Sequence, residues 1–183
     1  MSEINKKAQF ARGAIQRRII VLACSALFVA LSIICGKYLA IPFGNILRFS
    51  FENLPIILSG VLFGPLMGAL VGALADLLGC ILVGYAINPL VTAGAVAVGL
   101  LSGIIFRVTK KLPVGINLCL TVAVAHIVGS VVIKTFGLSV WYDIPLYELM
   151  LWRFFNYLIV GILEFLLLYA ILRVKTISDL KKN

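Results

Sequence analysis

Hydrophobic side chains run almost unbroken through the middle of this sequence. The stretch from Asn53 to Phe106 contains a single charged side chain, Asp76. As one continuous helix, with a rise of about 1.5 Å per residue, it would be roughly 80 Å long. The hydrocarbon core of a bilayer is only about 30 Å thick. We therefore expect the chain to cross a membrane more than once within this stretch.

Two groups of helix-breaking residues divide this stretch into three parts. Gly64-Pro65 forms the first break, because proline lacks the amide proton that a helix interior requires and glycine tolerates unusual backbone angles. The second break runs from Gly84 to Pro89. This spacing predicts helices near residues 52–64, 67–84 and 89–107.

Three further apolar runs complete the predicted set of helices. They cover Ile19 to about Leu39, Pro113 to Ile133, and Leu146 to Leu172. Each is long enough to cross a bilayer. A polar and aromatic loop is expected from Lys134 to Pro145. The predicted fold class is an all-α integral membrane protein, a bundle of six transmembrane helices in a single domain over residues 1–183.

Composition and charge support this interpretation and set the orientation. The 183 residues are 62% hydrophobic and 13% charged, whereas soluble domains are roughly 45–50% apolar and 25% charged. Basic residues cluster in the N-terminal segment 1–17 and at Arg18, from Arg107 to Lys111, and in the tail 174–183. Cytoplasmic loops are enriched in Lys and Arg, so both termini are predicted to be cytoplasmic. The net charge of +9 is then explained without a nucleic-acid partner. We expect a multi-pass protein of a bacterial plasma membrane, with no cleaved signal peptide.

Four basic residues are not explained by the orientation rule, because they map to the outer side of the predicted bundle. They are Lys37, Arg48, Lys134 and Arg153. Arg153 lies about two turns inside the last helix, and Asn156 and Tyr157 follow on the same helix face. A charge within the bilayer is costly, which favours an arginine that faces a polar cavity. The alternative is a side chain that extends to the outer headgroups.

The segment between the first two helices contains Arg48, four residues before Glu52. The two side chains could form a local salt bridge. Arg48 could instead bind the carboxylate of a ligand, which a guanidinium holds with two parallel hydrogen bonds. Aromatic residues are concentrated in the same outer half. Some are expected in an interfacial belt, and others are expected to stack on a flat ligand.

The remaining polar residues of the apolar runs are few and dispersed. Asp76 is expected to tie two helices together through a neighbouring hydroxyl or amide, although an acid within the membrane can also be functional. Glu164 is expected to pair with a basic residue or to face a partner. His126 has no second ligand at metal spacing, so a hydrogen-bonded core histidine is favoured over a metal site. The four cysteines are typical of buried small hydrophobic residues.

Small residues recur at every fourth position in several of the predicted helices. In lipid, such stripes let helix backbones approach closely, and internal packing is expected for most of them. The residues concerned are Gly60, Gly64, Gly68, Gly72, Ala95, Gly99 and Gly103. In the first helix, Ala26 and Ala30 could serve internal packing or form a docking face for another membrane subunit. The sequence lacks a G-x-x-x-x-G-K-[ST] phosphate loop, so uphill transport would need a separate ATPase.

Three stretches and the alanine pair together resemble a known family. The stretches are Leu47 to Pro55, Gly60-Val61-Leu62-Phe63-Gly64-Pro65 through Asp76, and Gly84-Tyr85-Ala86-Ile87-Asn88-Pro89-Leu90. With Ala26-x-x-x-Ala30 and the six-helix layout, the chain resembles the substrate-binding S-components of energy-coupling-factor (ECF) vitamin importers, and most closely the folate-specific branch. The resemblance spans nearly the whole chain.

This resemblance implies a transport subunit and not an enzyme. Such a subunit binds its vitamin on the extracellular side, docks through Ala26 and Ala30 on a transmembrane T-component with two ATP-hydrolysing subunits, and releases the vitamin inside. No cofactor is expected apart from folate as bound substrate. The expected substrate-binding residues are Arg48, Phe49, Asn53, Tyr85, Asn88, Lys134, Trp141, Arg153, Asn156 and Tyr157. Of these, Arg48 and Lys134, with Lys37 as a weaker candidate, would bind the glutamate carboxylates of folate.

Other functions remain open at this stage. The substrate could be another flat, anionic or amphipathic vitamin, such as a cobalamin or a modified purine. A different class of function would be a small intramembrane enzyme or an assembly scaffold. An enzyme would need a polar catalytic cluster at one depth of the membrane, whereas the acids of this sequence are dispersed.

Overall fold

The computed structural model describes residues 2–43 and 47–173, with side chains described at 15–41 and 49–173. The predicted cytoplasmic tail, 174–183, lies outside this range. In chain order the elements are α1 (Ser2–Ile33), η1 (Ile34–Tyr38), β1 (Ile41–Phe43), β2 (Leu47–Phe49), α2 (Asn53–Phe63), α3 (Pro65–Val83), α4 (Pro89–Val108), α5 (Val114–Val124), η2 (Ala125–Ile133), α6 (Lys134–Tyr142) and α7 (Leu146–Arg173). The segments η1 and η2 are π-helical.

Both predicted helix breaks are confirmed. Gly64 adopts a φ of 100°, a backbone angle that favours glycine, and Pro65 occupies the first turn of α3. Gly84 ends α3 in the left-handed conformation, with a φ of 73°. Asn88 then caps α4, because its side-chain oxygen accepts hydrogen bonds from the backbone amides of Leu90 and Val91.

The predicted loop from Lys134 to Pro145 is wrong. The chain remains helical through α5, η2 and α6, and a helix end appears only at Asp143, whose φ is 54°. The polar residues Lys134 and Thr135, which indicated a loop, lie instead on the buried face of a helix, together with Gly137. Only Asp143 and Pro145 act as helix breakers, so α7 begins directly afterwards, at Leu146.

The predicted all-α bundle is confirmed, with two refinements. Within the described residues, five helical spans are long and apolar enough to cross a bilayer; they are Ile15–Tyr38, Pro65–Val83, Pro89–Val108, Val114–Tyr142 and Leu146–Arg173. The sixth helix, α2, has only 11 residues and is about 16 Å long. It is a core helix, because most of its residues are buried. A short antiparallel hairpin, β1–β2, pairs Ile41 with Phe49 and adds a small strand element that the sequence did not predict.

Small residues join α2, α3 and α4 into the centre of the bundle, as the stripe predicted. A Cβ atom added at Gly99 would overlap the carbonyl oxygen of Gly68, and one at Gly72 would overlap that of Ala95. These backbones are therefore in direct contact, which Gly72 and Gly99 permit because glycine has no Cβ atom. Ile57 and Val98 are fully buried in the same core.

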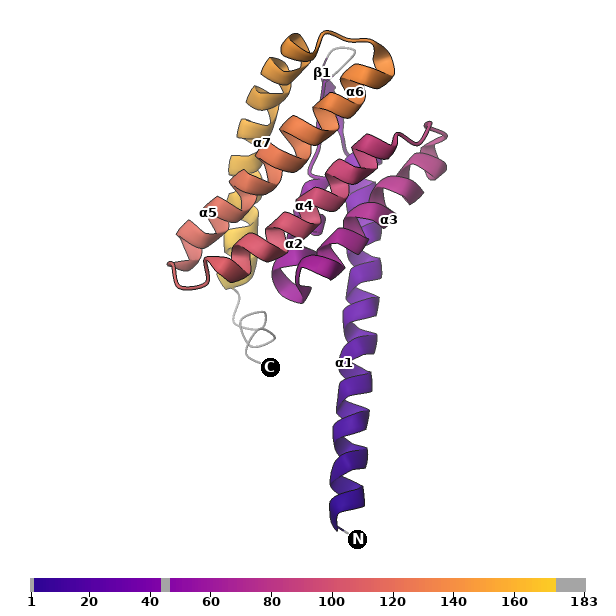
Figure 1. Cartoon of the computed structure of the whole chain (residues 1–183), viewed down its shortest axis with the longest axis vertical. Helices are drawn as coiled ribbons and strands as arrows, with labels where there is room; N and C mark the ends of the chain where they lie inside the picture. The colour runs from indigo at the N-terminus through magenta and orange to yellow at the C-terminus, as the bar shows by residue number, and fades with distance from the viewer. Residues whose placement is uncertain (1, 44–46, 174–183) are drawn as a thin grey trace.

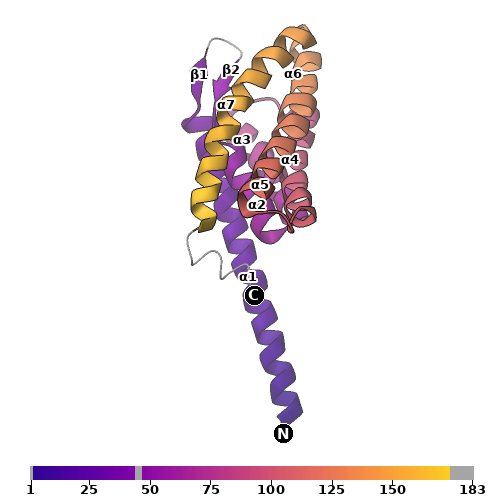
Figure 2. The same cartoon turned by 90° about the vertical axis from the view of Figure 1, so that its left-hand side faces the viewer.

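The bundle has two distinct ends. In Figure 1, α1 extends well past the other helices toward the N-terminus, while β1 and the turn after α6 lie at the opposite end. We call this opposite end the hairpin end. Figure 2 shows the hairpin standing beside α7 there. α2 begins near the hairpin end, at Asn53, and runs to the other end of the bundle, where Arg107 donates a hydrogen bond to the carbonyl oxygen of Phe63. We call that other end the Arg107 end.

Candidate functional site

Buried polar side chains gather at the hairpin end, where α2 begins. Six residues from three parts of the chain form this group, which we call the polar cluster: Glu52, Asn53, Ser130, Lys134, Arg153 and Tyr157. Glu52 and Asn53 come from the start of α2, Ser130 and Lys134 from η2 and α6, and Arg153 and Tyr157 from α7. A π-helical segment contributes Ser130; such segments occur frequently at functional sites.

Lys134 lies at the centre of the cluster. The residue is only 3% exposed. Its ammonium Nζ donates to Glu52 Oε1 at 2.8 Å and to Asn53 Oδ1 at 3.3 Å. Asn53, fully buried, donates in turn from Nδ2 to the hydroxyl of Ser130 at 3.1 Å. A charge from α6 is thereby connected to the beginning of α2.

Arg153 completes the cluster from the side of α7. One terminal nitrogen, Nη2, donates to the backbone carbonyl of Ser130 at 3.3 Å and to the hydroxyl of Tyr157 at 3.1 Å. The guanidinium carbon also lies 5.2 Å from the centre of the Tyr157 ring, close enough for a cation–π interaction. Arg153 is 9% exposed, so its side chain faces the interior as predicted, while the polar cavity expected in front of it stays a prediction.

Arg153 is a buried cation with no ion-pair partner among the described side chains. Among the side chains that the structure describes, no carboxylate forms an ion pair with it, and its Nε is buried without a hydrogen-bond partner. Removing a charge from water costs several kcal/mol unless an opposite charge or good hydrogen bonds offset the loss. The guanidinium therefore retains unused capacity to bind an acceptor.

A small recess adjoins the cluster between α1, α3 and α4. Lys37, Asp76, Glu52 and Lys134 all line it. Asp76 accepts a hydrogen bond of 2.6 Å from the hydroxyl of Thr92, so the predicted tie between two helices is confirmed. Lys37 lies 5.5 Å from the ring centre of Tyr85. Together, the recess and the polar cluster contain three described cations, Lys37, Lys134 and Arg153, and two described carboxylates, Glu52 and Asp76.

The charges of this region act together on Glu52, which directly precedes α2. Burial alone would raise the pKa of its carboxyl group, but the charge and hydrogen bond of Lys134, with contributions from Lys37 and Arg153, lower the pKa to about 2. Glu52 is therefore ionised at neutral pH, and its surroundings favour negative charge.

The other predicted site residues lie on several different elements of the structure. Asn156 is buried on α7, three residues after Arg153. Asn88 is buried as the cap of α4, and its Nδ2 donates to the carbonyl of Gly137 on α6. Tyr85 lies beside Lys37, and Trp141 is half exposed near the end of α6. Phe49 is half-buried in β2. The side chain of Arg48 lies outside the described residues.

Two members of the cluster were not anticipated as site residues. Glu52 was considered only as a local partner of Arg48, yet its carboxylate binds Lys134, far along the chain. Ser130 was not singled out at all. Lys134 was expected in an outer loop, but it is buried in the first turn of α6. No local pattern indicates these contacts, because the helices that bring them together are remote in sequence.

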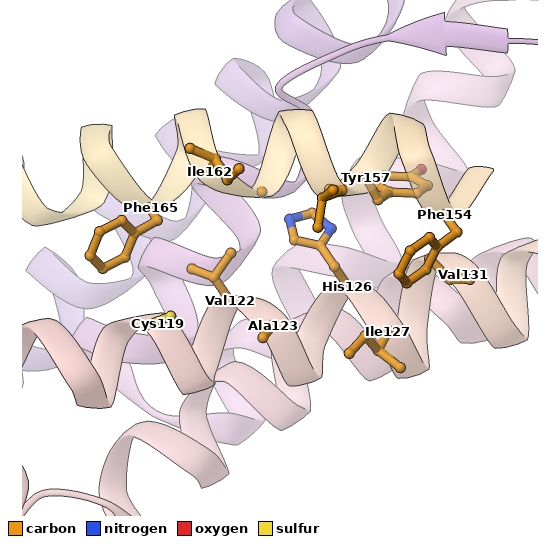
Figure 3. Close-up of a pocket in the computed structure, with 12 residues that line it drawn as sticks. Cys119, Val122, Ala123, His126, Ile127, Val131, Phe154, Tyr157, Ile162 and Phe165 are labelled. Atoms are coloured by element: carbon orange, nitrogen blue, oxygen red, sulfur yellow. The ribbon is translucent and has the colours of Figure 1, made fainter. Parts of the chain in front are cut away.

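A second, apolar cavity of about 290 Å³ lies between the α5–η2 segment and α7. Figure 3 shows His126 between these helices, with Phe154 and Tyr157 at one end of the cavity and Cys119 and Phe165 at the other. His126 Nε2 lies 2.7 Å from Glu164 Oε2, and both side chains are buried. The hydrogen-bonded core histidine and the pairing of Glu164 with a basic residue are thereby confirmed.

The two candidate sites differ in chemistry. Almost all of the lining of the cavity is apolar, and three of the lining residues, Phe154, Leu158 and Ile162, are also exposed on the protein surface. A polar vitamin would leave most of its donors and acceptors unpaired there, which is costly. The polar cluster offers cations, amides and aromatic rings instead. It is the stronger candidate for a site that binds a charged, water-soluble ligand.

Comparisons with known proteins agree with the predicted family. A family model described as ECF transporter, substrate-specific component, matches residues 21–174. Among solved structures, a crystal structure of FolT bound with folic acid shares 22% sequence identity, with a TM-score of 0.68; the match covers 82% of this chain and 90% of that one. The S-component for biotin from an ECF-type ABC transporter shares 19% identity, with a TM-score of 0.69; the match covers 85% of this chain and 92% of that one. No curated protein sequence matches this chain.

Proposed function

Since this chain belongs to the family of substrate-specific components of ECF transporters, we propose that it is the folate-binding subunit of a vitamin importer. The family is one of transport components and not of enzymes, and the five long apolar spans make this a multi-pass membrane protein. The proposal adds the ligand, the site and the direction: folate enters from outside at the hairpin end and is released in the cytoplasm of a bacterium, with both termini of the chain inside.

The buried guanidinium of Arg153 carries this assignment. A buried cation that lacks an ion-pair partner among the described side chains and has an unused donor is costly to the empty protein. A ligand that brings an acceptor or a negative charge removes that cost. Hydrogen bonds that involve a charged group contribute about 1.5–3 kcal/mol, which is a substantial part of a vitamin's binding free energy.

The chemistry of folate matches the hairpin end. Folate has a flat pterin, an aromatic ring, and a glutamate with two carboxylates. Lys134 and Arg48, with Lys37, would bind the carboxylates, while Arg153, Asn156 and Asn88 would bind the polar edge of the pterin. Asn53 would hold Lys134 in place. Tyr157 would lie against the ligand, and Phe49, Tyr85 and Trp141 would stack on its rings. Base-like aromatic systems gain free energy from such stacking.

Biotin is the second candidate, because the biotin S-component is as similar in fold as FolT is. Biotin carries one carboxylate and no aromatic ring, so it would use fewer of the three cations and none of the stacking surface. The arrangement of charges therefore favours folate. A fold likeness below 25% identity does not separate the two ligands, so a direct binding test is needed.

Competition binding with a panel of vitamins tests this function. Purified protein in detergent would be saturated with labelled folate and challenged with folate, biotin, a cobalamin and a purine base. We expect labelled folate to bind at one molecule per chain and unlabelled folate to displace it. Biotin, the cobalamin and the purine base should not displace it, even at a hundredfold excess. Displacement by biotin or a cobalamin, or failure to bind labelled folate at all, would contradict the assignment.

The proposed partners are a transmembrane T-component and two ATP-hydrolysing subunits. Ala26 and Ala30 lie on the same face of α1 and are both exposed, so the internal packing considered for them does not use this face. A small-residue stripe of this kind permits close approach of a second helix in lipid. We place the T-component there. ATP would be hydrolysed by the partner subunits and would not be bound by this chain.

A further inference from the structure

The contact between Lys134 and Glu52 gives the empty protein an internal ion pair at the position proposed for a ligand carboxylate. Lys134 Nζ lies 2.8 Å from Glu52 Oε1, and the lysine is almost completely buried. A buried ammonium group requires an anionic partner. In the empty protein that partner belongs to the protein itself, so a carboxylate from a ligand would have to compete for it.

Glu52 is anchored through its backbone, while its carboxylate reaches across to another helix. Its carbonyl oxygen accepts a hydrogen bond of 2.7 Å from the hydroxyl of Ser32 on α1. Its side chain passes close to Gly36, where an added Cβ atom would come within 2.8 Å of Glu52 Oε2. A glutamate at a helix N-terminus ordinarily interacts with the free amides of its own helix. Glu52 makes no such capping hydrogen bond and extends toward Lys134 instead.

The exposures of the two partners are unequal. The Lys134 side chain is 4% exposed, whereas that of Glu52 is 26% exposed. Rotation of the Glu52 side chain could therefore bring its carboxylate to water without moving the backbone, which Ser32 holds. Lys134 has no such route, because helices surround it. Of the two charges, only Glu52 can leave the pair at low cost.

We propose that Glu52 is an internal substitute for the carboxylate of the ligand, which a bound vitamin displaces from Lys134. This inference rests on the proposed function, which assigns a carboxylate-bearing vitamin to the polar cluster. It adds a determinant of specificity: a ligand without a carboxylate cannot replace Glu52 at Lys134, so only anionic ligands gain from this contact. Each such ligand binds more weakly than it would to an unpaired lysine, because it must first break the existing pair.

The variant Glu52→Gln tests this competition. Glutamine keeps the length and one acceptor oxygen but removes the charge, so the ligand no longer competes with an anion. We expect folate to bind about tenfold more tightly. This gain lies at the low end of the coupling free energies measured between close charge pairs. The affinity for folate diamide, in which both carboxylates are neutralised, should remain within about twofold. Titration calorimetry of the purified, full-length protein measures both.

Asp76→Asn is the matched control. It removes an equal charge from the same recess, but Asp76 is bonded to Thr92. We expect its folate affinity to stay within about twofold of that of the unmodified protein. An equal gain in both variants would show a general effect of charge and would overturn the role of Glu52. If Glu52→Gln lowers the melting temperature sharply, Glu52→Asp serves instead, because its shorter side chain weakens the pair and should give an intermediate gain.

The outcomes separate the two proposals. If the unmodified protein binds folate and Glu52→Gln binds it equally or more weakly, the substitution role of Glu52 is overturned while the proposed function stands. If the unmodified protein does not bind folate, the proposed function is wrong and the role of Glu52 in it fails as well. Tighter binding of folate by Glu52→Gln alone, with unchanged binding of the diamide, supports both.

Discussion

Replacing Arg153 by alanine is expected to weaken folate binding at least tenfold. The guanidinium is buried, has no ionic partner among the described side chains, and holds an unused donor at Nε. Loss of even one hydrogen bond from a charged group costs about 1.5–3 kcal/mol, which corresponds to a factor of roughly 10 to 150 in affinity. Titration of the purified variant with folate, beside the unmodified protein, measures the change.

Two further variants identify the cause of the loss. Arg153→Lys keeps the charge but not the planar fork of donors, so it should recover only part of the affinity. Arg107→Ala removes an exposed arginine at the opposite end of the bundle and should leave the affinity unchanged. An Arg153→Ala protein that melts normally and binds folate as tightly as the unmodified protein would remove Arg153 from the site.

Replacing His126 by leucine is expected to lower the free energy of unfolding by about 3–5 kcal/mol, because it leaves a buried carboxylate without its partner. Glu164 is completely buried, and its other oxygen, Oε1, already lacks a hydrogen-bond partner. The two groups lie well inside the helical spans Val114–Tyr142 and Leu146–Arg173. Thermal unfolding of the purified variant in detergent, followed by tryptophan fluorescence, measures the loss.

The double variant His126→Leu with Glu164→Leu is the informative control. Apolar replacement of both members of a buried pair is often neutral or stabilising, so most of the lost stability should return. Its folate affinity should stay close to that of the unmodified protein, because the pair adjoins the polar cluster only through His126, whose ring stacks on Tyr157 with 5.2 Å between the ring centres. A single variant as stable as the unmodified protein would show that the pair contributes nothing to stability.

The helices could be predicted from the sequence wherever their limits depend on local chemistry. Gly64-Pro65 and the segment from Gly84 to Pro89 end and begin helices by their own backbone preferences, so their breaks were found. The extension of the fifth helix through Lys134 could not be predicted in the same way. Its polar residues are typical of a loop in a membrane protein, and only tertiary contacts show that they face the interior of the bundle.

The same distinction applies to the candidate site. Arg153, Asn156 and Tyr157 are neighbours on one helix face, so their spacing alone indicated a polar stripe. The residues that complete the polar cluster around this stripe come from other parts of the chain: Ser130 comes from η2, and Glu52 joins through Lys134. These contacts join segments that are close only after folding. The sequence therefore predicted the cations of the site but not Glu52, the carboxylate that pairs with Lys134.

The most direct test of the central claim is to locate the bound vitamin. A folate derivative with a photoreactive group on its glutamate would be cross-linked to the purified protein, and the labelled peptides would be identified by mass spectrometry. We expect labelling that excess folate suppresses, in the peptides that contain Glu52 and Lys134. Labelling confined to Cys119 and Phe165 in the apolar cavity, or to the Arg107 end of the bundle, would contradict a vitamin site in the polar cluster.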